Sequence, residues 1–362
     1  MSKIEYKKLC EIVQTVKAPV KLKTEEYQLV GSYLIIDQGK DFQAGFTDDE
    51  SALLPFGEYI LYGDHTLSVK YFKGRFAQGA DGLKILKCKE GINKYIYYAL
   101  CTFNLHSTEY KRHWTQVKQI EIPLPPLSIQ QEIVSVLDSF TTLIDKMKKE
   151  VEMRKKQMEC YRERLMSPKE GWMVKTLGEI GTFTRGSGLQ KSDLRDAGFP
   201  CIHYGQIHTF YNFAAYKTKS FCDENYAKKL KKGKTGDLLI ATTSEDVEAC
   251  CKAVAWLGDS EVAYSTDAYC FSHDQDPKFM AYLFQTEMFA KQKRMAATGA
   301  KVVRVSGEAM ATFSFALPPL SKQREIARTL DIFEEYIQRL EKLISLRQKQ
   351  YEYYREKLLT FE

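Results

Sequence analysis

The chain has 362 residues, 44% of them hydrophobic and 28% charged, with a formal net charge of +6 at pH 7. This length suffices for two domains with separate cores, and the charge is compatible with a nucleic-acid partner without requiring one. No apolar run is long enough to cross a bilayer as a helix, which excludes a protein anchored by such helices. The nine cysteines form no C-x-x-C pair, and MSKIEYKKLCEIV lacks the apolar core of a signal peptide. We therefore expect reduced thiols and a cytoplasmic protein.

The first predicted elements, over residues 1–127, belong to a mixed globular region. Short runs rich in β-branched and aromatic residues, such as YLIID, YILYG and LKILKC, lie between glycine-containing turns and predict strands. The segment NKYIYYALCTF comes later and predicts a helix. Strands followed by helices in this order are typical of an α+β domain.

A long helix is predicted next, over residues 128–167. It follows the stretch LPPLSIQQEIVSVLD, in which Pro125 and Pro126 end the preceding strand and Ser128 is expected to cap the helix. About 38 residues follow the serine without Gly or Pro, which makes a helix of roughly 57 Å at 1.5 Å per residue. Its apolar residues recur every four and three positions, which indicates the seam of a coiled coil. The seam includes Leu137, Phe140, Ile144 and Met147, and it is interrupted by Arg154.

Residues 168–320 predict a second globular region of the same kind, and residues 321–362 predict a second long helix. The second region is longer, with 140 positions from Leu177 to Leu317 against 115 from Leu9 to Leu124. Its helix follows LPPLSKQREIARTLD, where Ser321 is the expected cap. The seam of this helix includes Leu330, Phe333, Ile337 and Leu340, and it is interrupted by Arg347.

The two long helices are copies of one sequence. With Leu124 placed on Leu317, an offset of 193 residues, about half of the paired residues are identical over an ungapped stretch. A weaker repeat precedes it, since EYKKLCEI resembles MVKTLGEI. The whole chain is therefore a duplication, and we expect two similar α+β regions whose helices pair as an antiparallel coiled coil with pseudo-twofold symmetry. At the interrupted positions, Arg154 and Arg347 either extend to solvent or set the register of pairing.

No catalytic motif stands out in the sequence. The Pro-Pro pairs lack the preceding Asn or Asp of an adenine or cytosine methyltransferase loop, and GKT at Gly233 lacks the glycine that opens a P-loop. His203 and His208 share a segment, but no Cys or carboxylate stands at ligand spacing, so we expect no metal site. The sequence predicts a protein that is not an enzyme.

The duplicated module, PLPPLSIQQEIVSVLDSF and LPPLSKQREIARTLDIF, resembles that of the specificity (S) subunit of type I restriction-modification systems. The resemblance covers the whole chain and implies that each globular region is a target recognition domain reading one half of a bipartite, asymmetric DNA site. It implies that the helices set the half-site spacing and dock two methyltransferase (M) subunits, and that motor-nuclease (R) subunits complete the complex. S-adenosylmethionine then belongs to the methyltransferase partner, and ATP and Mg belong to the motor-nuclease partner.

Two alternatives remain beside this resemblance. One is the S-type subunit of a related fused enzyme, in which a single partner chain carries both restriction and methylation. The other is a coiled-coil scaffold that joins proteins and has no DNA specificity. Basic loops at matched places in both globular regions favour DNA over the scaffold.

In the second globular region, candidate DNA contacts lie in five segments. RGSGLQKSDLR joins small residues to cations that reach phosphates, and HYGQIHTFY offers side chains that pair with base edges. KKLKKGKTGD is the densest basic run, TGAKVVRVS adds two cations, and residues 242–246 add hydroxyls and carboxylates. An ordinary solvated loop is the alternative for each segment. The candidates are Arg185, Lys191, Arg195, His203, Tyr204, Gln206, Lys228, Lys229, Lys231, Lys232, Lys301 and Arg304.

In the first globular region, three segments offer comparable side chains. IDQGKDF and GDHTLSVKYFKGR combine cations with hydrogen-bonding groups, and TEYKRHWTQVK is a basic cluster interleaved with aromatics from Tyr110 to Trp114. Trp114 either packs in the core or stacks on a base. The candidates are Gln38, Lys40, His65, Lys70, Arg75, Lys111 and Arg112.

Overall fold

The strands of the first globular region form small sheets in the computed structural model, which describes residues 4–79, 81–103, 105, 111–299 and 301–361. One sheet has the order β2-β8-β5-β6, a second has the order β4-β3-β7, and β1 pairs with β9. The strands are β1 (Glu5–Lys8), β2 (Val13–Val16), β3 (Tyr33–Ile36), β4 (Gly45–Thr47), β5 (Gly57–Gly63), β6 (Val69–Gly74), β7 (Ala77–Gln78), β8 (Leu83–Cys88) and β9 (Glu121–Leu124). The helices are α1 (Leu9–Ile12), α2 (Asn93–Leu100) and α3 (Trp114–Val117).

The second globular region repeats this topology with additions. Its sheets have the orders β11-β20-β16-β18-β13 and β14-β12-β19-β15, with β10 paired to β22 and β17 to β21. The strands are β10 (Met173–Thr176), β11 (Gly181–Arg185), β12 (Phe199–Ile202), β13 (Ala214–Ala215), β14 (Ser220–Cys222), β15 (Lys232–Gly233), β16 (Leu238–Ala241), β17 (Thr243–Ser244), β18 (Lys252–Trp256), β19 (Val262–Tyr264), β20 (Ala268–His273), β21 (Val303–Arg304) and β22 (Ser314–Leu317). The helices are α5 (Leu177–Ile180), α6 (Tyr204–Thr209), α7 (Glu224–Ala227), α8 (Pro277–Leu283), α9 (Glu287–Ala296) and α10 (Gly307–Ala311).

The predicted duplication and α+β class are confirmed strand by strand. The order β2-β8-β5-β6 corresponds to β11-β20-β16-β18, and β4-β3-β7 corresponds to β14-β12-β19. The greater length of the second region appears as strands β13 and β15 at the sheet edges and as helix α9. The sheets of the two regions are thus the same scaffold with different connecting loops.

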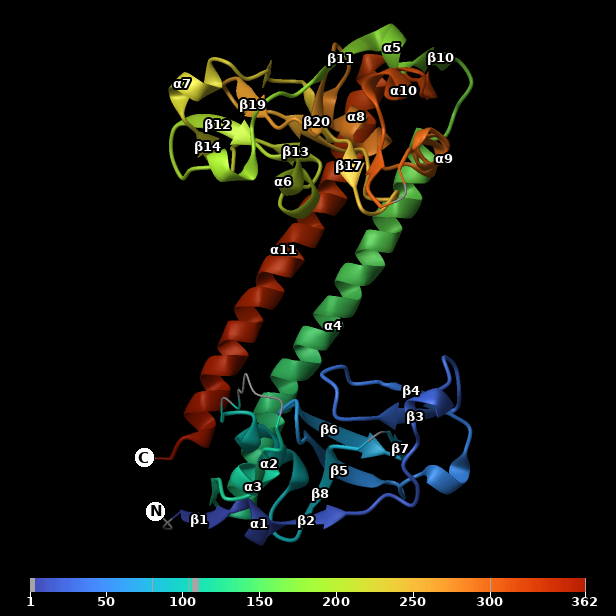
Figure 1. Cartoon of the computed structure of the whole chain (residues 1–362). Coiled ribbons are helices and arrows are strands. Elements are labelled where there is room, and N and C mark those ends of the chain that lie inside the picture. Colours follow the sequence, from blue (N-terminus) through green and yellow to red (C-terminus); the bar gives the residue numbers. More distant parts are fainter. Residues whose placement is uncertain (1–3, 80, 104, 106–110, 300, 362) are drawn as a thin grey trace. The chain divides into compact units, whose positions relative to one another are not determined.

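The chain divides into two units, residues 1–149 with 341–362 and residues 150–340 (Figure 1). Two helices cross this division, α4 (Leu127–Met166) and α11 (Leu320–Leu359), each of 40 residues and about 60 Å at 1.5 Å per residue. Each unit therefore contains one globular region, the start of the helix that follows it and the end of the other helix.

Each long helix begins one residue before the expected serine. The Gln130 N–H donates to the Pro126 carbonyl at 3.1 Å, and the Gln323 N–H donates to the Pro319 carbonyl at 3.1 Å. The first helical residues are Leu127 and Leu320, so the expectation that Ser128 caps α4 and Ser321 caps α11 is wrong. Proline fits just before a helix, because it has no N–H to leave unpaired while its carbonyl can accept the first helical bond.

The core of the first unit includes both long helices. Leu9 and Tyr95 of the globular region, Leu137 of α4 and Leu359 of α11 are buried in one apolar cluster. Fully burying a side chain of this size stabilises the fold by about 1.5–3 kcal/mol. The globular region and the helix segments of this unit thus share one hydrophobic core.

The predicted pairing of α4 with α11 is present in both units. In the first unit the rings of Phe140 and Tyr354 stack at 5.5 Å, and in the second Tyr161 packs on Phe333 at 5.2 Å. In the second unit the Tyr336 hydroxyl also donates to Glu150 at 2.9 Å. From Glu150 to Tyr161 the residue numbers rise along α4, whereas those of the partners fall along α11 from Tyr336 to Phe333. The two helices therefore run antiparallel. Of the predicted seam residues, Leu137, Ile144, Met147, Leu330 and Ile337 are buried, and Phe140, Phe333 and Leu340 are half-buried.

The two arginines at the interrupted seam positions are half-buried and differ in what they contact. The Arg154 guanidinium donates to Gln157 at 2.8 Å and to Glu150 at 3.3 Å, both on α4, and lies over the Tyr336 ring of α11 at 5.5 Å. The Arg347 guanidinium donates to Gln350 of its own helix at 2.6 Å. Of these recorded contacts, only that of Arg154 with Tyr336 joins the two helices.

None of the helices in the described part of the chain has an apolar stretch long enough to cross a membrane.

Candidate nucleic-acid interface

In the first unit, loops from several strands meet around Asp64, the residue that follows β5. Its N–H donates to the Gly82 carbonyl at 2.7 Å, and its carboxylate accepts the N–H groups of His113 at 2.9 Å and Trp114 at 2.8 Å. The carboxylate also lies 3.6 Å from the ammonium of Lys84. Through its backbone and its buried side chain, this one residue therefore holds together the turn after β5, the loop before β8 and the start of α3.

Several of the predicted DNA contacts of the first region lie at this loop cluster. The Gln38 Oε1 accepts the His65 N–H at 3.3 Å, so the loop after β3 adjoins the turn after β5. Lys111 and Arg112 directly precede His113 and are exposed, as is Lys40. Tyr110 lies outside the described residues. Gln38, Lys40, His65, Lys111 and Arg112 are thus the predicted residues placed on the loops at this end of the sheets.

Two predicted residues of the first region lie in other settings. Lys70 is buried and its ammonium donates to the backbone carbonyls of Asp37, at 3.2 Å, and Asp41. Burial lowers the pKa of Lys70, and its hydrogen bonds hold the loop after β3 against β6. Arg75 follows β6 at the opposite end of β5, where it lies 3.8 Å from Glu50 and over the Tyr33 ring at 5.4 Å.

In the second unit the equivalent loops meet around residues 265–267. The Thr242 N–H donates to the Asp267 carbonyl at 3.2 Å, as Asp64 does to Gly82, and the Tyr204 N–H donates to Ser265 Oγ at 2.8 Å. The Arg185 Nε donates to the Thr266 carbonyl at 3.2 Å. The loops after β11, β12 and β16 thus converge on the β19–β20 connection.

The two loop clusters have arginines at the same place. The Val305 N–H donates to the Thr242 carbonyl at 3.2 Å, as the His113 N–H donates to the Asp64 carbonyl at 3.0 Å. Arg304 and Arg112 are the residues before these donors, and both are exposed. Lys301 is exposed three residues before Arg304. An exposed arginine carries the hydrogen-bond donors that a phosphate or a guanine edge accepts.

The segment HYGQIHTFY of the second region forms a hydrogen-bonded helix start. The Gln206 Oε1 accepts the His203 N–H at 3.1 Å, and its Nε2 donates to Ser220 Oγ at 2.7 Å, so both ends of this amide are engaged within the chain. The His203 Nδ1 accepts the Gly205 N–H at 3.2 Å. Burial lowers the pKa of His203, which Asp267 opposes and the cation of Lys191 reinforces. A neutral imidazole is suited to base edges more than to phosphates.

Further predicted cations of the second region lie beside β14 and in the stretch from the end of α7 into β15. Arg195 forms an ion pair with Asp223 at 3.1 Å, and Lys228 donates to Asn225 at 3.0 Å. Lys229 and Lys231 are exposed, whereas Lys232 is half-buried over the Phe199 ring at 4.9 Å. This run adjoins the loop after β11, because Leu230 and Leu189 belong to one buried cluster.

Two exposed lysines of the first region, Lys17 and Lys21, are not among the DNA contacts predicted from the sequence. With Leu9 placed on Leu177, an offset of 168 residues, Lys17 falls on Arg185. Lys21 forms a bridge with Gln78 of β7 and an ion pair with Asp81 at 2.7 Å, a bond that lowers the pKa of Asp81. Carrying the weak repeat from α1 into the following loop would have identified Lys17.

Within the described ranges, no group of three His, Cys, Asp or Glu side chains is placed to hold a metal ion. The paired loop clusters instead present cations, amides and hydroxyls on a hydrogen-bonded scaffold. This chemistry is that of phosphate and base-edge contacts.

Comparison with known proteins identifies a family that matches this chain. The model of the type I restriction modification DNA specificity domain matches residues 1–153 and 169–347. A putative type I restriction enzyme specificity subunit of Haemophilus influenzae is 27% identical, over 99% of this chain and 96% of that protein. A type I restriction enzyme specificity subunit of Escherichia coli is 26% identical, over 94% of this chain and 90% of its own length.

Solved structures share the fold of the whole chain. The S subunit of a type I restriction-modification system from M. genitalium superposes with a TM-score of 0.63 at 15% identity, covering 99% of this chain and 97% of that one. A chain from a study of complex assembly and conformational transition of the type I R-M system gives a TM-score of 0.60 at 13% identity, covering 99% and 98%. The two family matches cover both globular regions and most of both long helices, so the chain belongs to the family of type I restriction-modification specificity subunits.

Proposed function

We propose that this chain is the non-catalytic subunit that gives a type I restriction-modification complex its DNA sequence specificity. Each globular region reads one half of a bipartite, asymmetric DNA site through the loop cluster of its unit. The antiparallel pair α4–α11 sets the spacing between the half-sites and docks two methyltransferase subunits. Motor-nuclease subunits complete the complex.

The observation that carries this proposal is one scaffold bearing two different sets of loops. The positions after β5 and β16 are occupied by Asp64 and Thr242, although the backbone bonds around them correspond. A cation is common to both loop clusters, as Arg112 in the first region and Arg304 in the second. Two regions of the same shape with different side chains at the same end are suited to reading two different sequences, which makes the target asymmetric.

The helices support the docking part of the proposal through apolar side chains outside their seam. On α4, Ile129, Val136 and Leu143 recur every seven residues and are 38%, 41% and 42% exposed. Residues spaced by seven lie along one face of a helix. The described part of their own unit covers these side chains only in part, and such an apolar stripe is suited to packing against another subunit.

Catalysis and cofactors belong to the partners in this proposal. S-adenosylmethionine binds the methyltransferase, which moves the methyl group to an adenine, and ATP and Mg bind the motor-nuclease. Chemistry on a base in a duplex requires that the base be flipped out, which also falls to the methyltransferase. In this proposal, the present chain determines where along the DNA the methyltransferase acts.

The fused restriction-methylation enzyme remains the second candidate, because the same reading subunit would serve a partner that carries both activities. A scaffold without DNA specificity is disfavoured by the matched cations of the two loop clusters.

The decisive experiment co-expresses the chain with its cognate methyltransferase and maps methylated adenines across a genome by single-molecule sequencing. We expect a split, non-palindromic motif. Replacing residues 168–319 by the corresponding region of a relative should change one half of that motif and leave the other half intact. Absence of a motif, or a palindromic one, would refute the proposal.

A further inference from the structure

In the second unit, helix α9 closes the corner between the end of α4 and the outer edge of β22. The Glu287 N–H, in the first turn of α9, donates to the Glu163 carboxylate of α4 at 3.0 Å. The Gln292 amide bonds both the N–H of Ser314 at 2.7 Å and its carbonyl at 3.0 Å. The Phe289 ring packs on Phe315 at 5.9 Å. A carboxylate, a strand edge and an aromatic surface thus hold the helix.

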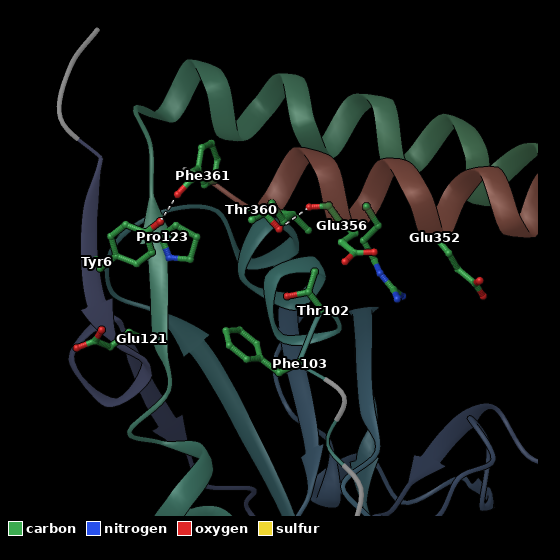
Figure 2. Close-up of a pocket in the computed structure, with 11 residues that line it drawn as sticks. Tyr6, Thr102, Phe103, Glu121, Pro123, Glu352, Glu356, Thr360 and Phe361 are labelled. Carbon is green, nitrogen blue, oxygen red and sulfur yellow. Dashed lines mark hydrogen bonds between the residues drawn. The ribbon is translucent and has the colours of Figure 1, made fainter.

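The same corner of the first unit is a pocket. Its volume is ≈ 730 Å³, and it is bounded by β1, β9, the end of α11 and the residues after α2 (Figure 2). In the described residues between α2 and β9, the only helix is the single turn α3, so no helix comparable to α9 covers the corner there. Among the described residues, the scaffold of this corner is therefore kept, and no counterpart of α9 fills it.

The groups that hold α9 have counterparts lining this pocket. At the offset of 193 residues, Glu356 of α11 falls on Glu163. Glu121 of β9 is paired with Lys8 of β1, and Ser314 of β22 is paired with Thr176 of β10. Glu121 therefore corresponds to Ser314, the residue whose backbone Gln292 bonds in the second unit. Within the described ranges, no partner is recorded for the Glu121 N–H and carbonyl on this outer edge. Phe103 supplies an aromatic wall.

The charge of the pocket identifies what it accepts. Glu121, Glu352 and Glu356 line it against one cation, Arg355, whose guanidinium lies over the Tyr351 ring at 5.4 Å. This acidic excess favours a positively charged group. The N-terminal end of a helix carries partial positive charge and unpaired N–H groups, and Glu163 binds such an end in the second unit.

We propose that this pocket binds a helix of the methyltransferase partner, entering with its N-terminal end toward Glu356 and a polar side chain on the Glu121 edge. The inference rests on the proposed function, which supplies the partner. Because α9 occupies the equivalent corner of the second unit, only one of the two docked methyltransferase copies makes this contact. The two copies are therefore held with unequal affinity.

The test uses the full chain reconstituted with the purified methyltransferase subunit. We expect Glu356→Lys and Glu352→Lys each to weaken binding of one methyltransferase copy roughly tenfold, by placing a cation against the helix end. Glu159→Lys is the matched control, because Glu159 is the counterpart of Glu352 beside the corner that α9 occupies. It should leave both affinities unchanged, as measured by mass photometry across a concentration series.

A second measurement does not depend on charge reversal. The variant Glu121→p-benzoylphenylalanine should crosslink to a helix of the methyltransferase in the assembled complex, identified by mass spectrometry. The same substitution at Ser314 should crosslink within the chain, to α9. Crosslinks from position 121 to residues 104–110 of the chain, or to a second copy of it, would overturn the inference, as would unchanged affinity for Glu356→Lys. Failure of the unmodified chain to bind any methyltransferase would instead overturn the proposed function.

Discussion

The Tyr98 hydroxyl donates a hydrogen bond to Oδ1 of Asp138 at 2.6 Å, joining α2 of the first globular region to α4. Lys94 completes the contact with an ion pair to Asp138 at 2.8 Å. The second unit repeats it, with Tyr282 at 2.9 Å and Lys278 at 2.9 Å from Asp331. The aspartate of each LD pair in the repeated module is therefore a brace between a globular region and its helix.

We predict that Tyr98→Phe destabilises the first unit by about 2 kcal/mol, the usual contribution of a hydrogen bond to a charged group. The ring keeps its packing while the carboxylate loses one donor. Urea unfolding of the full chain measures the change, and Ser139→Ala, one residue along α4 on the exposed surface, serves as the control. An effect no larger than that of Ser139→Ala would show that the bond does not brace the unit.

The contact of Arg154 with Tyr336 predicts that only one of the two repeated arginines couples the helices. A double-mutant cycle of Arg154→Leu and Tyr336→Leu should give an interaction energy of about 0.5–1 kcal/mol, typical of a cation over an exposed ring. The counterpart of Tyr336 in the first unit is Leu143, so the cycle of Arg347→Leu with Leu143→Ala should give an interaction energy near zero. Equal coupling in both cycles would contradict this distinction.

The matched arginines predict separate effects on the two half-sites. Arg112→Ala should relax base preference in one half of the methylated motif and Arg304→Ala in the other, each by about 1–3 kcal/mol of discrimination if the contact is to a guanine edge. Arg75→Ala is the control, since Arg75 lies at the opposite end of β5. Motif mapping of each variant provides the readout, and a change in both halves from one substitution would count against the assignment.

The exposed lysine run predicts a uniform electrostatic effect. Lys228→Ala with Lys231→Ala should weaken binding to every sequence and reduce the slope of log affinity against log salt by about 2, if each lysine neutralises one phosphate. Binding of the full complex to cognate and unrelated duplexes over a salt series measures this slope. A change in sequence preference with an unchanged slope would show that these lysines read bases instead.

Two half-buried histidines predict that the second unit loses stability in mild acid. The His208 Nε2 donates to the Thr243 carbonyl at 3.0 Å, and burial lowers the pKa of both His208 and His273. The unfolded chain takes up these protons below about pH 6.5, whereas the folded chain resists them. Stability is therefore full above that pH and declines as the pH falls below it.

Urea unfolding between pH 7.5 and pH 5.5 tests this decline. The double variant His208→Gln with His273→Gln should have a shallower dependence on pH, because its folded state no longer excludes two protons that the unfolded chain would bind. An unchanged dependence would assign the acid sensitivity to other groups.

The long helices were predictable because their information is local. A seven-residue apolar repeat depends only on neighbouring sequence, and the ungapped copy revealed the equivalent positions of Arg154 and Arg347. The cap was misplaced by two residues, because serine is a common cap whereas here the carbonyl of Pro126 accepts the first helical bond and Leu127 is already helical. Local sequence signals therefore predict that each long helix exists but do not determine the residue at which it begins.

The loop clusters were predictable only in part, because burial is set by distant residues. Lys70 looks like any cation in a strand, but the loop after β3 folds over it and takes its ammonium as a donor. Gln206 has the side chain expected of an adenine contact, yet its amide is used between His203 and Ser220. Lys17 was overlooked because the weak repeat has to be extended through β2 to reach it, and the pairing of β2 with β8, like that of β11 with β20, supports this extension.

The Tyr6 hydroxyl donates to the Phe361 carbonyl at 2.7 Å, so β1 touches the chain just beyond α11. In the second unit the corresponding neighbours, α4 and β10, are joined by the peptide segment 167–172. One junction is covalent and the other is held by side-chain contact, although both connect a long helix to the strand that opens a globular region. Each unit therefore brings the end of a long helix to the strand that opens a globular region, so this junction belongs to the repeated scaffold whether side chains or the backbone make it.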